Sequence, residues 1–172
     1  VEAFDIFNHS LQMRQALEYD AILVGGAGEY DVLDDNPRIR SLTNFLIEIT
    51  ECGHPMFASC FGFQALVIGL GGQVIQDEPN AEVGTYRLRR LPSAAGDPVF
   101  GALPQEFNAQ LGHKDRALEM PDGVDVMAES DLCPFQALRV KGKPIFATQF
   151  HPELTWLDNR QRFERYMPQY GR

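Results

Sequence analysis

The sequence predicts an α/β protein built on an open, mostly parallel, twisted sheet with helices on both faces. Two observations carry this prediction. Buried apolar segments of strand length alternate with helical segments up to residue 72, which is typical of a parallel sheet covered by helices. After residue 82 the chain changes to short strand-like segments separated by turn residues. That change predicts a small antiparallel insertion, followed by a final core strand.

The first elements are short. The alternation of apolar and polar residues in AFDIF (3–7) predicts a strand. The apolar spacing in LQMRQALE (11–18) predicts a short helix. DAILVGGAG (20–28) is predicted to be a buried strand that stops in glycines. The chain is therefore expected to open with a strand, a helix and a second strand.

The clearest helix is predicted at residues 36–53. Asn36 can cap it with its side chain, Pro37 suits the first helical position and Gly53 ends it. Apolar residues at helical spacing form one stripe that can be buried against a sheet. The stripe consists of Ile39, Leu42, Phe45, Leu46 and Ile49.

The remaining elements follow the same patterns. A second buried strand is predicted at 54–60, followed by a helix at 61–72. A terminal helix is predicted over 157–170, broken near Pro168, since proline lacks the amide proton that a helix interior needs. Between them lie the strand-like segments of the insertion and the final core strand, at 83–91, 124–130, 136–142 and 144–152.

Length, charge and cysteine content limit the classes of function that this chain can have. The 172 residues suit one domain, and the formal net charge of −9 argues against nucleic-acid binding through a general basic surface. No apolar run reaches about 18 residues, so no membrane span is expected. The three cysteines are irregularly spaced, so neither a metal site nor a disulfide framework is expected. A reducing, cytoplasmic setting fits this cysteine usage best.

The stretch ASCFG (58–62) places a cysteine between the second buried strand and its helix. Small residues two positions before and after Cys60 let the backbone turn sharply. A helix N-terminus lowers the pKa of a thiol and presents backbone N–H groups to developing negative charge. Cys60 is therefore either a nucleophile or a structural cysteine in a strand-to-helix turn, and this stretch fits both.

Two further motifs end predicted strands. In FHPE (150–153), His151 and Glu153 are two residues apart on an extended segment, so their side chains can form a base and its orienting carboxylate. In VGGAG (24–28), glycines let backbone N–H groups approach a ligand, although no Lys-Ser/Thr follows as in a Walker loop. Alone, FHPE also fits a surface segment, and VGGAG a tight strand exit.

The three motifs are more specific together than alone, because each lies at the carboxyl end of a predicted strand. In open α/β sheets this edge is where sites assemble. A nucleophile at Cys60, a base at His151, an orienting Glu153 and oxyanion donors from the glycine loop can all meet there. The sequence therefore predicts one catalytic site at this edge.

With these motifs the chain resembles the class I glutamine amidotransferase family. The family has a Gly-x-Cys-x-Gly-x-Gln elbow, a late Gln-Phe-His-Pro-Glu and an early strand ending in Gly-Gly-x-Gly. This chain shows ASCFGFQ, TQFHPE and VGGAG. The segment 111–130 is similar to the family's middle segment, and the resemblance covers residues 20–153. It implies a flavodoxin-like three-layer fold, similar to the amidotransferase domain of GMP synthase but standing alone.

The resemblance implies a role for each matching residue. Cys60 would be the nucleophile, His151 the base and Glu153 its orienter, with no metal and no cofactor. The backbone N–H groups of Gly26 and Phe61 would form the oxyanion hole. The substrate glutamine would be held by further positions, namely Gln64, Gly28, Gly112 and His113.

Two features depart from the family pattern. Ala58 and Ser59 stand where the family usually has glycine and an aliphatic residue; alanine is still small, whereas a buried Ser59 needs a hydrogen-bond partner. The family's fold also opens with a strand and helix before the strand expected at 3–7, and that first strand is central. Without this central strand, the strands on either side of it would have backbone N–H and C=O groups with no hydrogen-bond partner. We therefore expect the single domain at 1–172 to be N-terminally truncated, or another polypeptide to supply the strand.

The implied activity is hydrolysis of the glutamine side-chain amide through a cysteine thioester, releasing ammonia for a synthase partner. Two alternatives stay open. A γ-glutamyl peptidase or hydrolase would use the same triad on other small γ-glutamyl compounds, and a catalytically silent binding subunit would keep only the fold.

Overall fold

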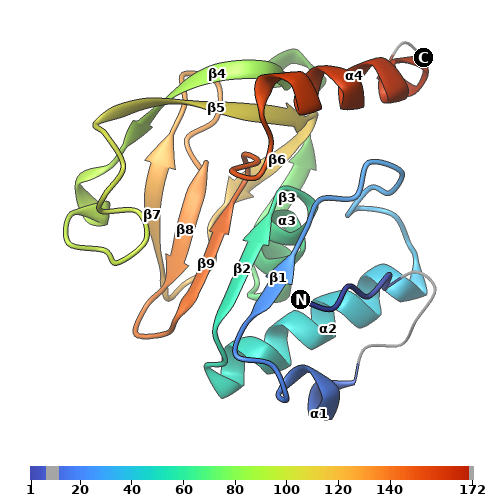
Figure 1. Ribbon diagram of the computed structural model, residues 1–172, viewed down its shortest axis with the longest axis vertical. Helices are drawn as coiled ribbons and strands as arrows, with labels where there is room; N and C mark the ends of the chain where they lie inside the picture. The colour runs from blue at the N-terminus through green and yellow to red at the C-terminus, as the bar shows by residue number, and fades with distance from the viewer. Residues whose placement is uncertain (7–11, 171–172) are drawn as a thin grey trace.

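The computed structural model describes residues 1–6 and 12–170, and it has the predicted α/β architecture (Figure 1). Its helices are α1 (Met13–Ala16), α2 (Pro37–Cys52), α3 (Phe61–Gly69) and α4 (Trp156–Tyr170). Its strands are β1 (Ile22–Val24), β2 (Met56–Ser59), β3 (Gln73–Gln76), β4 (Glu82–Arg90), β5 (Glu106–His113), β6 (Asp115–Glu119), β7 (Val124–Glu129), β8 (Ala137–Val140) and β9 (Ile145–Thr148). A seven-stranded sheet has the order β1-β2-β9-β8-β7-β4-β5, and β3 pairs with β6 in a separate sheet.

The fold class predicted from the sequence is confirmed, with a larger antiparallel part than expected. Strands β1, β2 and β9 are parallel neighbours, whereas β8, β7, β4 and β5 continue the same sheet in antiparallel pairs. The long strand β5 was not predicted, although Phe107, Ala109 and Leu111 give it the alternation of a strand. Strands β3 and β6 were also missed, and they pair only with each other.

The central strands carry a hydrophobic core on each face of the sheet. In β9, Ile145 and Ala147 join the core that contains α2 and α3, whereas Phe146 packs against the other core. The second core is closed by the curled antiparallel strands and by Phe100 from the segment after β4. Because successive side chains of a strand point to opposite faces, β9 is buried on both sides. It is thus a rigid support for the residues that follow it.

Helix α2 forms as predicted, because its local sequence specifies both ends. Asn36 accepts a hydrogen bond from the backbone N–H of Arg38 (2.8 Å), and Gly53 ends the helix with φ 68°. All five residues of the predicted apolar stripe are buried. The terminal helix α4 also forms, but it continues through Pro168 to Tyr170. The predicted break is therefore wrong: α4 extends two residues beyond Pro168, although this residue has no N–H to donate to the carbonyl four residues earlier.

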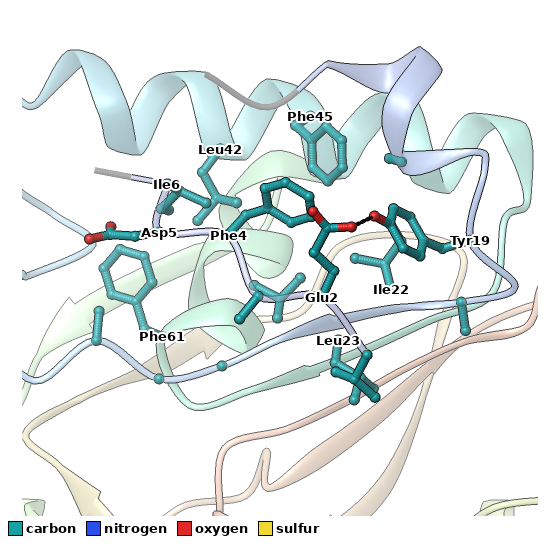
Figure 2. A pocket seen from close by; sticks show the side chains of 18 of the residues that line it. Glu2, Phe4, Asp5, Ile6, Tyr19, Ile22, Leu23, Leu42, Phe45 and Phe61 are labelled. Carbon is teal, nitrogen blue, oxygen red and sulfur yellow. Dashed lines mark hydrogen bonds between the residues drawn. The ribbon is translucent and has the colours of Figure 1, made fainter. Parts of the chain in front are cut away.

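The strand predicted at 3–7 is wrong for its described residues, since residues 3–6 adopt no strand; Phe7 lies outside the described residues. A strand forms only where its backbone pairs with another strand, and residues 3–6 pair with none of the described strands, which leaves β1 at one edge of the sheet. A cavity of about 900 Å³ lies between β1, α2 and residues 1–6. Figure 2 shows Leu42 and Phe45 of α2 pointing toward Phe4 across it. The additional central strand that the family resemblance implies, and with it the truncation, stays a prediction.

The short N-terminal helix is present as α1, within the predicted range 11–18, of which Leu11 lies outside the described residues.

None of the helices that the structure describes combines the length and the apolar character needed to cross a membrane.

Candidate active site

Cys60 lies in a strained turn between β2 and α3. Its backbone has φ 52° and ψ −104°, and it is the only non-glycine residue with positive φ in the described part of the chain. Such a conformation is unfavourable for a residue with a Cβ atom, and it persists only where the surroundings enforce it. Here the Cys60 N–H donates to the carbonyl oxygen of Thr148 in β9 (2.8 Å). The sheet therefore holds the cysteine in the elbow predicted from the sequence.

The elbow depends on close contact between α3 and β1. A Cβ atom at Gly62 would lie 2.8 Å from Val24 Cγ1 and 2.9 Å from the Val24 carbonyl oxygen. Only glycine therefore lets the start of α3 come this near to β1. Ala58, which replaces the usual glycine before the cysteine, is fully buried in the core. Ser59 is also buried and lies opposite Thr148 in the β2–β9 register.

His151 and Glu153 form a close pair directly after β9. Nδ1 of His151 is 2.6 Å from Oε1 of Glu153, and only 1% of His151 is exposed. The backbone N–H of His151 donates to the carbonyl oxygen of Gln110 in β5 (2.9 Å). The imidazole is thus fixed both by its own backbone and by the carboxylate. This is the arrangement that the spacing of the two residues predicts.

The environment favours the protonated form of His151. Burial lowers its pKa, but hydrogen bonds with Cys60 and Glu153 outweigh burial and raise the pKa to about 9. For Glu153, burial raises the pKa, while the hydrogen bond to His151 is among the contacts that bring it below its ordinary value. The pair therefore combines a carboxylate with an imidazole that readily accepts and keeps a proton beside Cys60.

The glycine loop, which is the VGGAG motif at 24–28, packs against both His151 and Cys60. A Cβ atom at Gly26 would lie 2.8 Å from Cε1 of His151 and 3.5 Å from Cβ of Cys60. The three motifs, which are far apart in the sequence, therefore meet at one point. Phe61 is the first residue of α3, and its amide has no acceptor within the helix. The backbone N–H groups of Gly26 and Phe61 thus belong to segments that flank Cys60.

Gln64 is buried and already engaged within the protein. Its Nε2 donates to the carbonyl oxygen of Asp115 (2.8 Å) and to Oε1 of Gln149 (3.3 Å). Gln149 is fully buried, and its own Nε2 is 3.9 Å from Sγ of Cys60. The sequence reasoning assigned no role to Gln149, although it lies in the quoted TQFHPE motif. A role of Gln64 in holding substrate stays a prediction.

His113 belongs to a buried polar cluster. Its Nε2 is 3.2 Å from Oε2 of Glu82, which is fully buried, and its Nδ1 is 3.0 Å from the Asp115 carbonyl oxygen. The same Glu82 oxygen accepts from Nε2 of Gln136 (2.5 Å). The His113 side chain therefore holds β4, β5 and the start of β6 together. The predicted binding of the substrate glutamine therefore concerns the backbone at Gly112 and His113, and it stays a prediction.

The other predicted positions lie around the glycine loop and at the end of β5. Gly28 lines the 900 Å³ cavity together with Gly26 and Phe61, but none of the lining residues is Cys60, His151 or Glu153. Gly112 lies in β5, and a Cβ atom added to it would lie 3.9 Å from Oδ1 of Asn159 in α4. Among the residues that the structure describes, no group of three or more His, Cys, Asp and Glu side chains is arranged to hold a metal ion.

The fold and these contacts define an α/β protein with its site around a cysteine on a strand-to-helix turn. The chain belongs to the class-I glutamine amidotransferase family, whose model matches residues 2–165. It is 32% identical to a glutamine-hydrolyzing GMP synthase subunit of Methanocaldococcus jannaschii over 123 residues, which cover 72% of this chain and 63% of the relative. The corresponding subunit of Archaeoglobus fulgidus is 26% identical over 149 residues, 87% of this chain and 74% of the relative.

Solved structures share the fold. A glutamine amidotransferase from Thermotoga maritima superimposes with a TM-score of 0.79 at 20% identity, covering 92% of this chain and 67% of that one. A putative GMP synthase subunit from Thermoplasma acidophilum has a TM-score of 0.72 at 23% identity, with 94% and 79% covered. The chain spans less than two thirds of the M. jannaschii relative and 20% of the glutamine-hydrolyzing GMP synthase of Thermosipho africanus.

Proposed function

We propose that this chain hydrolyses the side-chain amide of glutamine through a thioester on Cys60 and releases ammonia. The observation that carries the proposal is the convergence of Cys60, on its strained elbow, with Gly26 and the His151–Glu153 pair. A nucleophile, a base, an orienting carboxylate and oxyanion donors are the parts that acyl transfer from an amide needs. Membership of the class-I glutamine amidotransferase family supports the choice of glutamine.

In the first half-reaction His151 takes the proton of Cys60, and the sulfur attacks the side-chain carbonyl carbon of glutamine. The oxyanion that forms is stabilised by the backbone N–H groups of Gly26 and Phe61, each worth about 3–4 kcal/mol in a comparable site. The C–N bond then breaks, and ammonia leaves with the proton from His151. Glu153 remains a carboxylate and stabilises the imidazolium between these steps.

In the second half-reaction water attacks the γ-glutamyl thioester. His151 accepts a proton from the water, and the same two N–H groups stabilise the second oxyanion. The C–S bond breaks, glutamate leaves, and the proton returns from His151 to the sulfur of Cys60. Because the M. jannaschii and A. fulgidus relatives are separate subunits of GMP synthase, we propose that the ammonia passes to a separate synthase partner.

The substrate class is tested by measuring ammonia or amine release from a panel of glutamine, γ-glutamyl amides and γ-glutamyl peptides. We expect glutamine to have the highest kcat/KM, by about 10-fold or more over γ-glutamyl peptides. A preference for the peptides would instead assign the chain to the γ-glutamyl hydrolases. No turnover together with no adduct on Cys60 from a glutamine-mimicking electrophile would favour a silent binding subunit.

Replacing Glu153 by glutamine should lower both activity and the pKa of His151. The amide removes the anion that helps raise that pKa to about 9, and we expect ammonia release to fall about 10²-fold. Because the pKa of His151 is higher in the folded protein than its ordinary value of 6.5, protonation of His151 stabilises the folded state. This contribution to the free energy of unfolding is fully present below pH 6.5 and is lost as pH rises through about 9. Since Glu153 is half exposed, we expect a deficit of only about 1 kcal/mol at pH 6.

The Glu153→Gln deficit should be smaller at pH 9.5 than at pH 6, as measured by urea unfolding at the two values. Glu164→Gln is the matched control, because Glu164 is exposed and pairs with Arg160 within α4 (2.9 Å). The control should match the wild type in activity at both pH values. Equal ammonia release by Glu153→Gln and the wild type would remove Glu153 from the proposed mechanism.

A further inference from the structure

A guanidinium group from α4 lies against the imidazole of His151. Nη1 of Arg162 is 3.3 Å from Nδ1 and 3.3 Å from Nε2 of the same ring. In the plane of the ring, an atom equidistant from both nitrogens would collide with the Cε1–H group between them. The guanidinium nitrogen therefore lies over the ring face, which is a common way for arginine to stack on a planar side chain.

This position differs from the contacts that the ring already makes. Nδ1 is paired with Glu153 at 2.6 Å, and the imidazole also hydrogen-bonds with Cys60. Those contacts fix the directions in which the two nitrogens point. The imidazole plane can still tilt about the line that joins Cys60 and Glu153. A group stacked on the face of the ring restrains this tilt.

Arg162 is delivered by a helix that is itself anchored. Thr155 and Asp158 cap the start of α4, with Thr155 Oγ1 donating to Asp158 Oδ2 (2.6 Å) and Asp158 N–H donating to Thr155 Oγ1 (3.2 Å). Asn159, three residues before Arg162 and on the same side of the helix, donates to the carbonyl oxygen of Leu111 in β5 (3.1 Å). Figure 1 shows α4 lying across one end of β4 and β5, reached directly from β9.

The charged and titratable groups around His151 come from separate elements. The elbow contributes Cys60, the segment after β9 contributes Glu153, and α4 contributes Arg162. Strand β5 presents the backbone carbonyl of Gln110 to the His151 N–H, and the glycine loop presents the uncharged Gly26. Arg162 is thus the cation that faces His151, and its charge lowers the pKa of the histidine against the effect of Cys60 and Glu153.

We propose that Arg162 is a positioning residue for the amide hydrolysis proposed above, on which this inference rests: its guanidinium covers the face of His151 and holds the imidazole in line between Cys60 and Glu153. Its positive charge also makes the imidazolium a stronger acid, which helps it give its proton to the departing ammonia. Arg162 touches neither the sulfur nor the scissile bond in this role.

The test compares Arg162→Gln, Arg162→Lys and the control Arg160→Gln in the full chain. We expect Arg162→Gln to lower kcat for glutamine about 10-fold, to change KM less than about 2-fold, and to raise the pKa of His151 by about 0.5–1 in an NMR titration of the labelled imidazole. Arg162→Lys should restore the pKa but not kcat, since an ammonium carries the charge without the planar stack. Arg160, exposed and paired with Glu164, should tolerate glutamine with no change.

Two results would overturn the inference. The first is a kcat and a His151 pKa in Arg162→Gln that both equal those of the wild type. The second is a raised KM with unchanged kcat, because it would assign Arg162 to substrate binding. The NMR titration needs no substrate, so it reads the contact between Arg162 and His151 even if glutamine proves not to be turned over. Failure of the proposed function and failure of this inference are therefore distinguishable.

Discussion

We expect Cys60→Ser to lower ammonia release from glutamine by at least about 10³-fold while leaving the fold intact. A serine hydroxyl is a much weaker acid and a poorer nucleophile than a thiol, so the transfer of its proton to His151 and the attack that follows would be much slower. The side chains are of similar size, and Cys60 is 9% exposed in a turn fixed by its backbone bond to Thr148. Serine should therefore occupy the elbow with the same backbone conformation.

The measurement is a coupled assay of ammonia together with thermal unfolding of the same samples. Cys52→Ser is the matched control, because Cys52 is an exposed free cysteine at the end of α2. The control should keep full activity, and both variants should unfold within about 2 °C of the wild type. If Cys60→Ser released ammonia at the rate of the control, Cys60 would not be the nucleophile.

The second large effect is expected from Gly26→Ala. The added methyl carbon would lie 2.8 Å from Cε1 of His151 and 3.5 Å from Cβ of Cys60. His151 has little room to yield, since its backbone is bonded to Gln110 and its ring to Glu153. Either the ring or the glycine loop must move, and a displacement of about 1 Å in an active site can cost about 10²-fold in rate. We therefore expect kcat/KM for glutamine to fall about 10²-fold.

Gly25→Ala provides a matched control, one residue away in the same loop. A Cβ atom at Gly25 would meet nothing within 4 Å, so this variant should retain activity within about 2-fold. Both variants are compared by kcat/KM and by the rate at which a glutamine-mimicking electrophile labels Cys60. Equal values for the two alanine variants would show that the close approach of Gly26 to His151 does not matter for the reaction.

Much of the fold could be predicted because local sequence specifies it. The bounds of α2 follow from Asn36, Pro37 and Gly53, and its buried face follows from apolar spacing alone. The proposed triad could be named for a similar reason. Cys60 lies between small residues at a strand-to-helix turn, and His151 and Glu153 are two apart on extended backbone. Each motif needs only a few neighbouring residues to be recognised.

Other parts depend on partners that are distant in the sequence. The alternation in residues 3–7 predicted a strand, but a strand forms only where it pairs with another, and residues 3–6 pair with no strand of the described sheet. In β5 the apolar residues alternate, yet its long pairing with β4 is what makes it a strand. Gln64 donates to the Asp115 carbonyl oxygen and to Gln149, contacts that its own motif does not indicate, while its role in holding substrate stays a prediction.

The sequence by itself determined the α/β class, the cysteine elbow and the order of the three motifs, because turn glycines, helix caps and strand alternation act over a few residues. Only the tertiary structure decided that Arg162 lies against the face of His151. Arg162 is eleven residues further along the chain, on a helix whose charges look like an ordinary solvated face. It reaches the imidazole because Asn159 fastens α4 to β5, and a contact between separately folded elements leaves no local pattern in the sequence.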